Sequence, residues 1–304
     1  MSPKRRLSQE GQARPNNVSG SKSQVFSKAD TPEKKQAWVH EIFESISTDY
    51  DRMNDVESFG LHRRWKRVLV RSVAESLKLE KAGAAGEVRV AEKTPTNAAT
   101  PDCGPGCNKE ASTALDVACG TGDITIALAI VLPAAVEVCG LDFSERMLEV
   151  ASSRVAALPP EVRRPYLMHG DALHLPFADN SLQALSISFG LRNLPDYAAA
   201  LREFNRVLAP GAKFFCLDAS YPTTAVVKPL FRLYFKHLMP RLASFVVGHR
   251  QEYKWLNDST EAFLSKSALA ALMAACGFQD VGFRSFFCGV AALHIGVKPL
   301  RPGV

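Results

Sequence analysis

Three short apolar runs in the middle of the chain end at residues that can bind a nucleoside. The first is followed by Gly120-Thr121-Gly122, the second ends at Asp142 and the third leads to Asp171. A glycine turn between a strand and a helix lets a ligand approach the backbone closely. Asp142 lies 20 residues after Gly122 (142 − 122 = 20), where a carboxylate can accept hydrogen bonds from both ribose hydroxyls. Together these residues predict a ribose site.

The third glycine of a dinucleotide fingerprint is missing from this turn. It would lie three positions after Gly122, where the chain has Thr125. Without it, tight binding of a pyrophosphate on the following helix is disfavoured. A ribose site without a pyrophosphate site favours S-adenosylmethionine and argues against a nicotinamide cofactor.

Two further acids extend the predicted site. Asp171 is placed to accept from an adenine amino group, and the amide of Ala172 can reach a ring nitrogen. A turn cap after Gly170 is the other role open to Asp171. Asp116 lies inside the first apolar run, where an unpaired carboxylate is costly, so we expect it to accept from backbone amides or from the ligand's ammonium group.

Apolar runs alternate with segments of helical periodicity. The runs are expected strands over 114–119, 136–141, 166–168, 185–189 and 213–217, the last after a turn at Pro210-Gly211. Helices are expected over 123–132, 145–157 and 197–208, after a helical pattern over 38–77. Parallel strands need crossovers that cover the sheet, so the pattern predicts an α/β, doubly wound, mostly parallel sheet. Ligands bind at the carboxyl ends of such strands, where the glycine turn and the acids collect.

Composition narrows the class of protein. With 304 residues, 46% of them hydrophobic, the chain can form one large α/β domain. No apolar run reaches the ~18 residues of a spanning helix, so membrane contact is expected to be peripheral. The seven scattered cysteines argue against a disulfide-stapled secreted protein. The net charge is +6, and a basic cluster free of acids fits either phosphate groups or a solvated surface; it consists of Arg63, Arg64, Lys66, Arg67 and Arg71.

We expect a single domain over 31–300, preceded by a disordered basic extension over 1–30. Its expected parts are a helical segment (36–80), a flexible inserted loop (81–112), the cofactor-binding core (113–220), a helical lid (225–250), and a final helix and strands (260–298). Cys103 and Cys107 lack a second pair at ligand spacing, so no metal is expected. The expected location is the cytoplasm, peripheral on the inner membrane face. An organelle is the alternative if the extension is a transit peptide.

Six segments make the chain resemble the ubiquinone/menaquinone biosynthesis C-methyltransferase family. The most specific are LDVACGTGD at 115–123, SFGLRN at 188–193 and GVAALH at 289–294; the others lie at 39–47, 50–55 and 58–66. The resemblance covers 38–299 except the expected loop, and within the family it is greater to the menaquinone-making branch.

The resemblance implies a seven-stranded methyltransferase fold that contacts S-adenosylmethionine through Thr121, Asp142, Asp171 with Ala172, and Ser188. It also implies a polyprenyl quinol substrate methylated on a ring carbon. Demethylmenaquinol is the favoured substrate, and a polyprenyl benzoquinol of ubiquinone biosynthesis is the alternative.

Methylation of a ring carbon needs an electron-rich ring, which loss of the proton from the neighbouring hydroxyl provides. Arg192 is the candidate cation for stabilising the phenolate, with Asn193 as a second donor. A salt bridge to a carboxylate such as Asp196 is the alternative for Arg192. The base is left open between a bound water and the side chains of Tyr50, Asp51 and His62. Packing is the other role open to His62, and His294 is expected to be structural.

Three other functions stay in view. Thr125 disfavours a nicotinamide oxidoreductase. The basic charge would suit a nucleic-acid methyltransferase, but SFGLRN at 188–193 replaces the Asp/Asn-Pro-Pro-aromatic motif of amino-methylating enzymes, so no nucleic-acid partner is expected. A non-catalytic scaffold that binds the cofactor or a quinone is the third, and a homodimer is left open.

Overall fold

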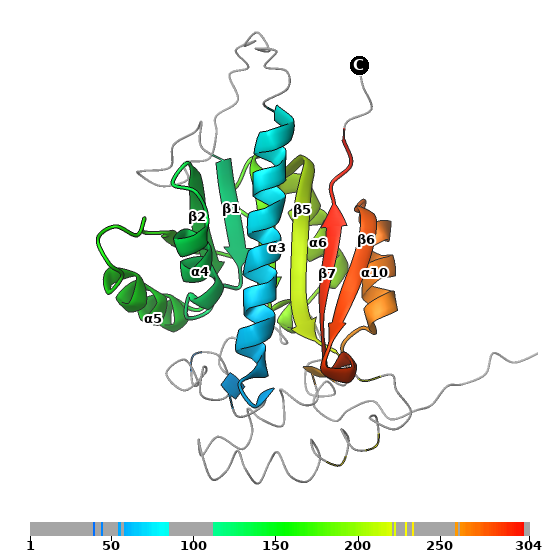
Figure 1. The fold of residues 1–304 in the computed structure, drawn as a ribbon. Helices are drawn as coiled ribbons and strands as arrows, with labels where there is room; N and C mark the ends of the chain where they lie inside the picture. Colours follow the sequence, from blue (N-terminus) through cyan, green and yellow to red (C-terminus); the bar gives the residue numbers. More distant parts are fainter. Residues whose placement is uncertain are drawn as a thin grey trace, which may run out of the picture.

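The computed structural model describes residues 39, 44, 54, 55, 58–84, 112–220, 222, 229, 233, 259, 260 and 262–300. One seven-stranded sheet forms its centre, with helices on both faces (Figure 1). The strands are β1 (Ser112–Val117), β2 (Val136–Asp142), β3 (Tyr166–His169), β4 (Leu182–Ser188), β5 (Leu208–Ala219), β6 (Gln279–Phe286) and β7 (Ala291–Val297). The helices are α3 (Leu61–Ala84), α4 (Asp123–Val131), α5 (Glu145–Ala156), α6 (Tyr197–Val207) and α10 (Lys266–Ala275), with 3₁₀ turns η2 (Leu191–Asn193) and η4 (Phe287–Gly289).

The strand order is β3-β2-β1-β4-β5-β7-β6. The first five strands pair in parallel, whereas β7 runs antiparallel to both β5 and β6. The predicted doubly wound, mostly parallel sheet is therefore confirmed. The order reverses between β1 and β4, and a reversal of this kind opens a crevice at the carboxyl ends of the two strands.

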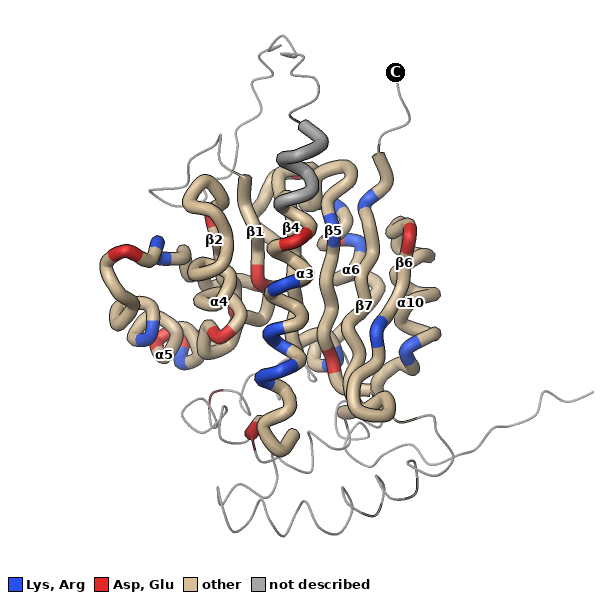
Figure 2. Tube along the Cα trace, viewed as in Figure 1, with Lys and Arg blue, Asp and Glu red and all other residues tan. Residues whose placement is uncertain are grey.

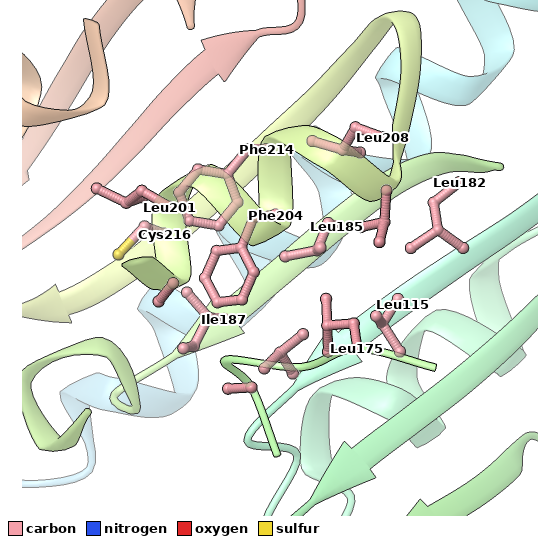
Figure 3. Close-up of a cluster of buried hydrophobic side chains, with 14 of the residues drawn as sticks. Leu115, Leu175, Leu182, Leu185, Ile187, Leu201, Phe204, Leu208, Phe214 and Cys216 are labelled. Carbon is pink, nitrogen blue, oxygen red and sulfur yellow. The ribbon is translucent and has the colours of Figure 1, made fainter. Parts of the chain in front are cut away.

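Successive side chains of each strand point to opposite faces of the sheet, and each face has its own hydrophobic core. On β5, Phe214 and Cys216 face a core shared with α6 and α10, whereas Phe215 and Leu217 face a core shared with α3 and α4. Figure 3 shows part of the first core, in which Phe204 of α6 lies close to Phe214. Successive side chains on opposite faces thus fix each strand between two helical layers.

Several expected boundaries differ from the structure by a few residues, and two of the differences have a clear local description. Pro210-Gly211 lies within β5, where Leu182 pairs with Leu208 but Ala184 pairs with Lys213, so the extra residues form a bulge. Proline is tolerated there because a bulge interrupts the hydrogen-bond ladder. Helix α3 extends to Ala84, past the expected end of the helical segment at residue 80. The expected basic extension over 1–30, the expected lid over 225–250 apart from residues 229 and 233, and the Cys103–Cys107 pair lie outside the described residues.

Candidate active site

A cavity opens at the carboxyl ends of β1 to β4. Its walls surround about 710 Å³ of space, including the part open to solvent. Much of its wall is apolar, with Leu141, Phe143 and Met147 on one side. Six residues expected at the site also line it: Gly120, Asp142, Asp171, Ala172, Ser188 and Asn193.

Asp142 is held at the end of β2 by two backbone amides. Its Oδ2 accepts from Gly120 N at 2.7 Å, and its Oδ1 accepts from Ser144 N at 2.9 Å. Burial raises the pKa of this carboxyl, and the two amide hydrogen bonds oppose that rise. The amide of Phe143 lowers the pKa of this carboxyl in the same way. A carboxylate has about four acceptor positions, so the side chain can still accept a hydrogen bond from a ligand in this fixed orientation.

Asp171 caps a turn and also lines the cavity. Its Oδ1 accepts from Leu173 N at 2.9 Å, which caps the turn after β3. Its Oδ2 lies 3.4 Å from His174 Nδ1, and 38% of the side chain is exposed on the wall of the cavity. The turn cap therefore leaves the carboxylate accessible to a ligand.

Among the described residues that line the cavity, two have a buried polar side-chain atom without a hydrogen bond. These atoms are Ser188 Oγ and Asn193 Oδ1. The amide nitrogen of Asn193 donates to Phe189 O at 3.3 Å, which orients the side chain. Because an unmade hydrogen bond to a buried polar atom is costly, these atoms fit a polar ligand such as S-adenosylmethionine.

The ends of β1 and β4 adopt left-handed backbone conformations where they meet beneath the cavity. Ala118 has φ 53° and Phe189 has φ 57°. A Cβ atom at Gly190 would lie 2.7 Å from the Cβ of Ala118, closer than carbon atoms approach. Glycine is therefore required at 190, and non-glycine residues with positive φ are typical of functional sites.

Asp116 is buried beneath the cavity and does not line it. Its oxygens accept from the hydroxyls of Thr125 at 2.8 Å and Ser186 at 2.9 Å, in place of the expected backbone amides. Burial raises the pKa of Asp116 from 3.8 to about 7, and the two hydroxyls oppose the rise. Thr125, where a dinucleotide fingerprint has glycine, thus belongs to a buried network that joins β1, β4 and α4.

Thr121 and Gly122 belong to the support of the glycine turn. The hydroxyl of Thr121 accepts from Arg154 Nη1 at 3.0 Å, and the same nitrogen lies 2.9 Å from Asp123 Oδ1. Gly122 is the N-cap residue of α4 and has φ 84°. A Cβ atom added to it would lie 3.2 Å from the Cβ of Ala151, which is a tight contact. Neither residue lines the cavity, so of the turn only Gly120 does.

Arg192 forms a buried ion pair with Asp218. Its Nη1 lies 2.5 Å from Asp218 Oδ1 and 2.9 Å from Phe189 O, and its backbone amide donates to Asp218 Oδ2 at 3.2 Å. The alternative role of Arg192, a salt bridge to a carboxylate, is therefore present, and the partner is Asp218. Asp196 instead caps α6 by accepting a hydrogen bond from Ala199 N. Arg192 is absent from the cavity lining, whereas its neighbour Asn193 is present. No sequence motif identified Asp218, because β5 pairs with β4 only in the folded sheet.

His62 has the surroundings of a packing residue. The hydroxyl of Ser58 donates to Asn54 O and lies 2.7 Å from His62 Nδ1, so that nitrogen carries the proton. Burial and the charge of Lys66 lower the pKa of His62 to about 4, and it does not line the cavity. Tyr50 and Asp51 lie outside the described residues. His294 is buried in β7 with Nε2 2.9 Å from Lys266 O, as a structural role requires.

The sheet has the strand order β3-β2-β1-β4-β5-β7-β6 with β7 antiparallel, and its cavity joins a glycine turn to an acid at the end of the next strand. These features define a Rossmann-like methyltransferase that depends on S-adenosylmethionine. The chain belongs to the ubiE/COQ5 methyltransferase family, whose model matches residues 30–90 and 99–298. Residues 91–98, which separate the two matched segments, fall inside the expected inserted loop.

Curated relatives match nearly the whole chain. The demethylmenaquinone methyltransferase of Staphylococcus haemolyticus is 40% identical over 87% of this chain and 95% of its own length. That of Staphylococcus saprophyticus is 40% identical over 89% of this chain and 100% of its own. A solved SAM-dependent methyltransferase of Thermotoga maritima is 18% identical over 86% of this chain and 99% of its own, with a TM-score of 0.49.

Proposed function

We propose that this enzyme transfers the methyl group of S-adenosylmethionine to a ring carbon of demethylmenaquinol. The observation that carries the proposal is the 40% identity to demethylmenaquinone methyltransferases over almost their full length. The apolar cavity with a few polar groups supports it, because a polyprenyl quinol presents an apolar ring with two hydroxyls.

Within the cavity we assign Asp142 to the ribose hydroxyls, since its carboxylate lines the cavity in a fixed orientation and keeps acceptor capacity for a ligand. Asp171 with the Ala172 amide is assigned to adenine. Ser188 ends β4 and Asn193 lies in the η2 turn that follows, and both line the cavity. We assign the unpaired Ser188 Oγ to the cofactor and the unpaired Asn193 Oδ1 to the quinol hydroxyl.

The sulfonium methyl is already activated, so the protein's task is to align the donor with the ring carbon and to favour the phenolate. We infer that Arg192 acts on this step through position: its pair with Asp218 holds the carbonyl of Phe189 and the η2 turn that carries Asn193. Direct stabilisation of the phenolate by Arg192 stays a prediction, and so does the identity of the base.

Methyl transfer from radiolabelled S-adenosylmethionine to demethylmenaquinol in detergent micelles tests the proposed function. We expect label in the quinol fraction and, by mass spectrometry, a product heavier by one methylene group. A benzoquinol precursor of ubiquinone run in parallel should take up little label. Labelling of the benzoquinol alone would favour the alternative substrate, and binding of the cofactor without any transfer would favour a scaffold.

A further inference from the structure

An arginine-lined groove runs between α3 and β6, apart from the cavity described above. We use the name arginine groove for its four arginines and three aromatic residues, which are Arg64, Arg67, Arg71, Arg284, Trp65, Phe286 and Phe287. The three arginines of α3 follow one another at intervals of three and four residues, so they share one face of the helix. Figure 2 shows basic residues in succession along α3.

The charge of this groove is not neutralised within the described part of the chain. The acids beside α3 pair with other basic side chains: Asp55 with Arg63 at 2.5 Å and Asp123 with Lys66 at 2.9 Å. No ion pair there involves an arginine of the groove, and Glu75 is the one acid among its described lining residues. Four exposed arginines against one glutamate leave the groove at +3. Guanidinium groups match phosphate oxygens in geometry and charge.

Exposed aromatic side chains lie at the end of the groove where α3 begins. Phe287 is 65% exposed in the η4 turn, and Phe59 is 69% exposed in the turn before α3. Trp65 is buried and stacks on Phe286 with centroids 6.1 Å apart. Its ring is therefore not presented for stacking on a nucleic-acid base. Arginines beside exposed phenylalanines fit a membrane interface better, because cations meet head groups while aromatic rings enter the acyl boundary.

The groove begins near the edge of the sheet where the cavity opens. The Lys66–Asp123 ion pair fixes the first turns of α3 against the start of α4, directly after the glycine turn. A flat anionic surface that contacts the groove therefore lies close to the carboxyl ends of the strands. Among the described residues no helix is long and apolar enough to cross a bilayer.

We propose that the arginine groove binds the phosphate head groups of anionic phospholipids and docks the enzyme on the membrane that holds its substrate. The purpose of the contact rests on the proposed function, because a polyprenyl quinol resides in the bilayer. The binding itself depends only on the groove.

Flotation of the full-length protein with vesicles tests the docking. The probes are vesicles of phosphatidylcholine alone and vesicles with roughly one third phosphatidylglycerol, at low salt. Because each basic residue near an anionic surface tightens partitioning roughly fivefold, Arg67→Gln/Arg71→Gln should weaken binding to anionic vesicles by roughly 25-fold. Arg202→Gln/Lys213→Gln is the matched control, with the same loss of charge outside the groove. Both double variants keep the basic extension over 1–30 unchanged.

Strong binding to anionic vesicles, weak binding to neutral ones, and loss only in the groove variant are the expected results. Equal weakening in the control would show that net charge decides, and absence of wild-type binding would overturn the proposal. It would also be overturned if the groove variant lost affinity for an RNA oligonucleotide while vesicle binding stayed intact. Adding inorganic phosphate at constant ionic strength distinguishes a site for lipid head groups from a site for free phosphate. Release of the protein from vesicles by free phosphate would indicate a soluble-phosphate site instead.

A second measurement separates docking from catalysis. The groove variant should methylate quinol in detergent micelles at the wild-type rate, but quinol in anionic vesicles more slowly. Failure of the wild type in micelles would contradict the proposed function and leave the vesicle-binding result to be judged separately. Equal rates of variant and wild type in vesicles would contradict the docking role.

Discussion

The buried carboxyl of Asp116 predicts that this protein loses stability as the pH rises. In the folded state burial raises the pKa of Asp116 from 3.8 to about 7, against the hydrogen bonds of Thr125 and Ser186. Between these two pH values the unfolded chain releases a proton that the folded chain retains. The contribution of Asp116 to stability is therefore fully present below pH 3.8 and falls as the pH rises to about 7.

The size of the effect follows from the same pKa values. Each pKa unit corresponds to about 1.4 kcal/mol, so the rise from 3.8 to about 7 amounts to about 4 kcal/mol in total. Asp116→Asn keeps the shape and does not titrate, and its amide can pair with the same two hydroxyls, which both donate and accept. Relative to this variant, the wild type should lose about 2 kcal/mol of unfolding free energy between pH 5 and pH 7.

Urea unfolding of both proteins at several pH values checks this expectation. Asp280→Asn is the matched control, because Asp280 is exposed and asparagine tolerates its φ of 50°. Stability curves of wild type and Asp116→Asn that run parallel in pH, or that diverge in the wild type's favour as the pH rises, would refute the reasoning. Calorimetry adds a second test: since Asp116 does not line the cavity, cofactor affinity should hardly change. A loss of roughly tenfold or more would instead support its pairing with the ligand's ammonium group.

Four further variants probe the site and its support. Asp142→Asn places an amide group against the N–H of Gly120 or Ser144, so we expect the affinity for the cofactor, measured by calorimetry, to fall roughly ten- to hundredfold. The control Glu145→Gln should bind the cofactor as the wild type does. Equal affinities of Asp142→Asn and the wild type would exclude the ribose role. Gly122→Ala meets both φ 84° and the Cβ of Ala151, so urea unfolding should show a loss of about 1–2 kcal/mol, whereas Gly282→Ala, with nothing within 4 Å, should show none. Arg192→Ala and Asp218→Asn break one ion pair and should each lower turnover by roughly 100-fold with near-normal cofactor affinity. Asp196→Asn, which alters only the cap of α6, is the control, and unchanged turnover in the first two would remove the pair from the mechanism.

Local patterns in the sequence determined the parallel sheet and the edge at which the ligand residues collect. An apolar run long enough for a strand, a glycine or acid at its end and a helical pattern after it are properties of neighbouring residues. Because parallel strands place their carboxyl ends on one edge, Gly120, Asp142 and Asp171 had to approach one another once the strands paired. The structure brings them to one cavity.

Contacts between distant strands were decided only by the tertiary structure. Asp116 and Ser186 meet because β1 and β4 pair in one particular register, and Arg192 meets Asp218 because β5 lies next to β4. The choice of Asp218 over the nearby Asp196 cannot be deduced from spacing, since register depends on how whole faces of the sheet pack against their helices. The arginine groove is a tertiary feature for the same reason: the sequence contains the basic run of α3, but folding places Arg284 and Phe287 beside it.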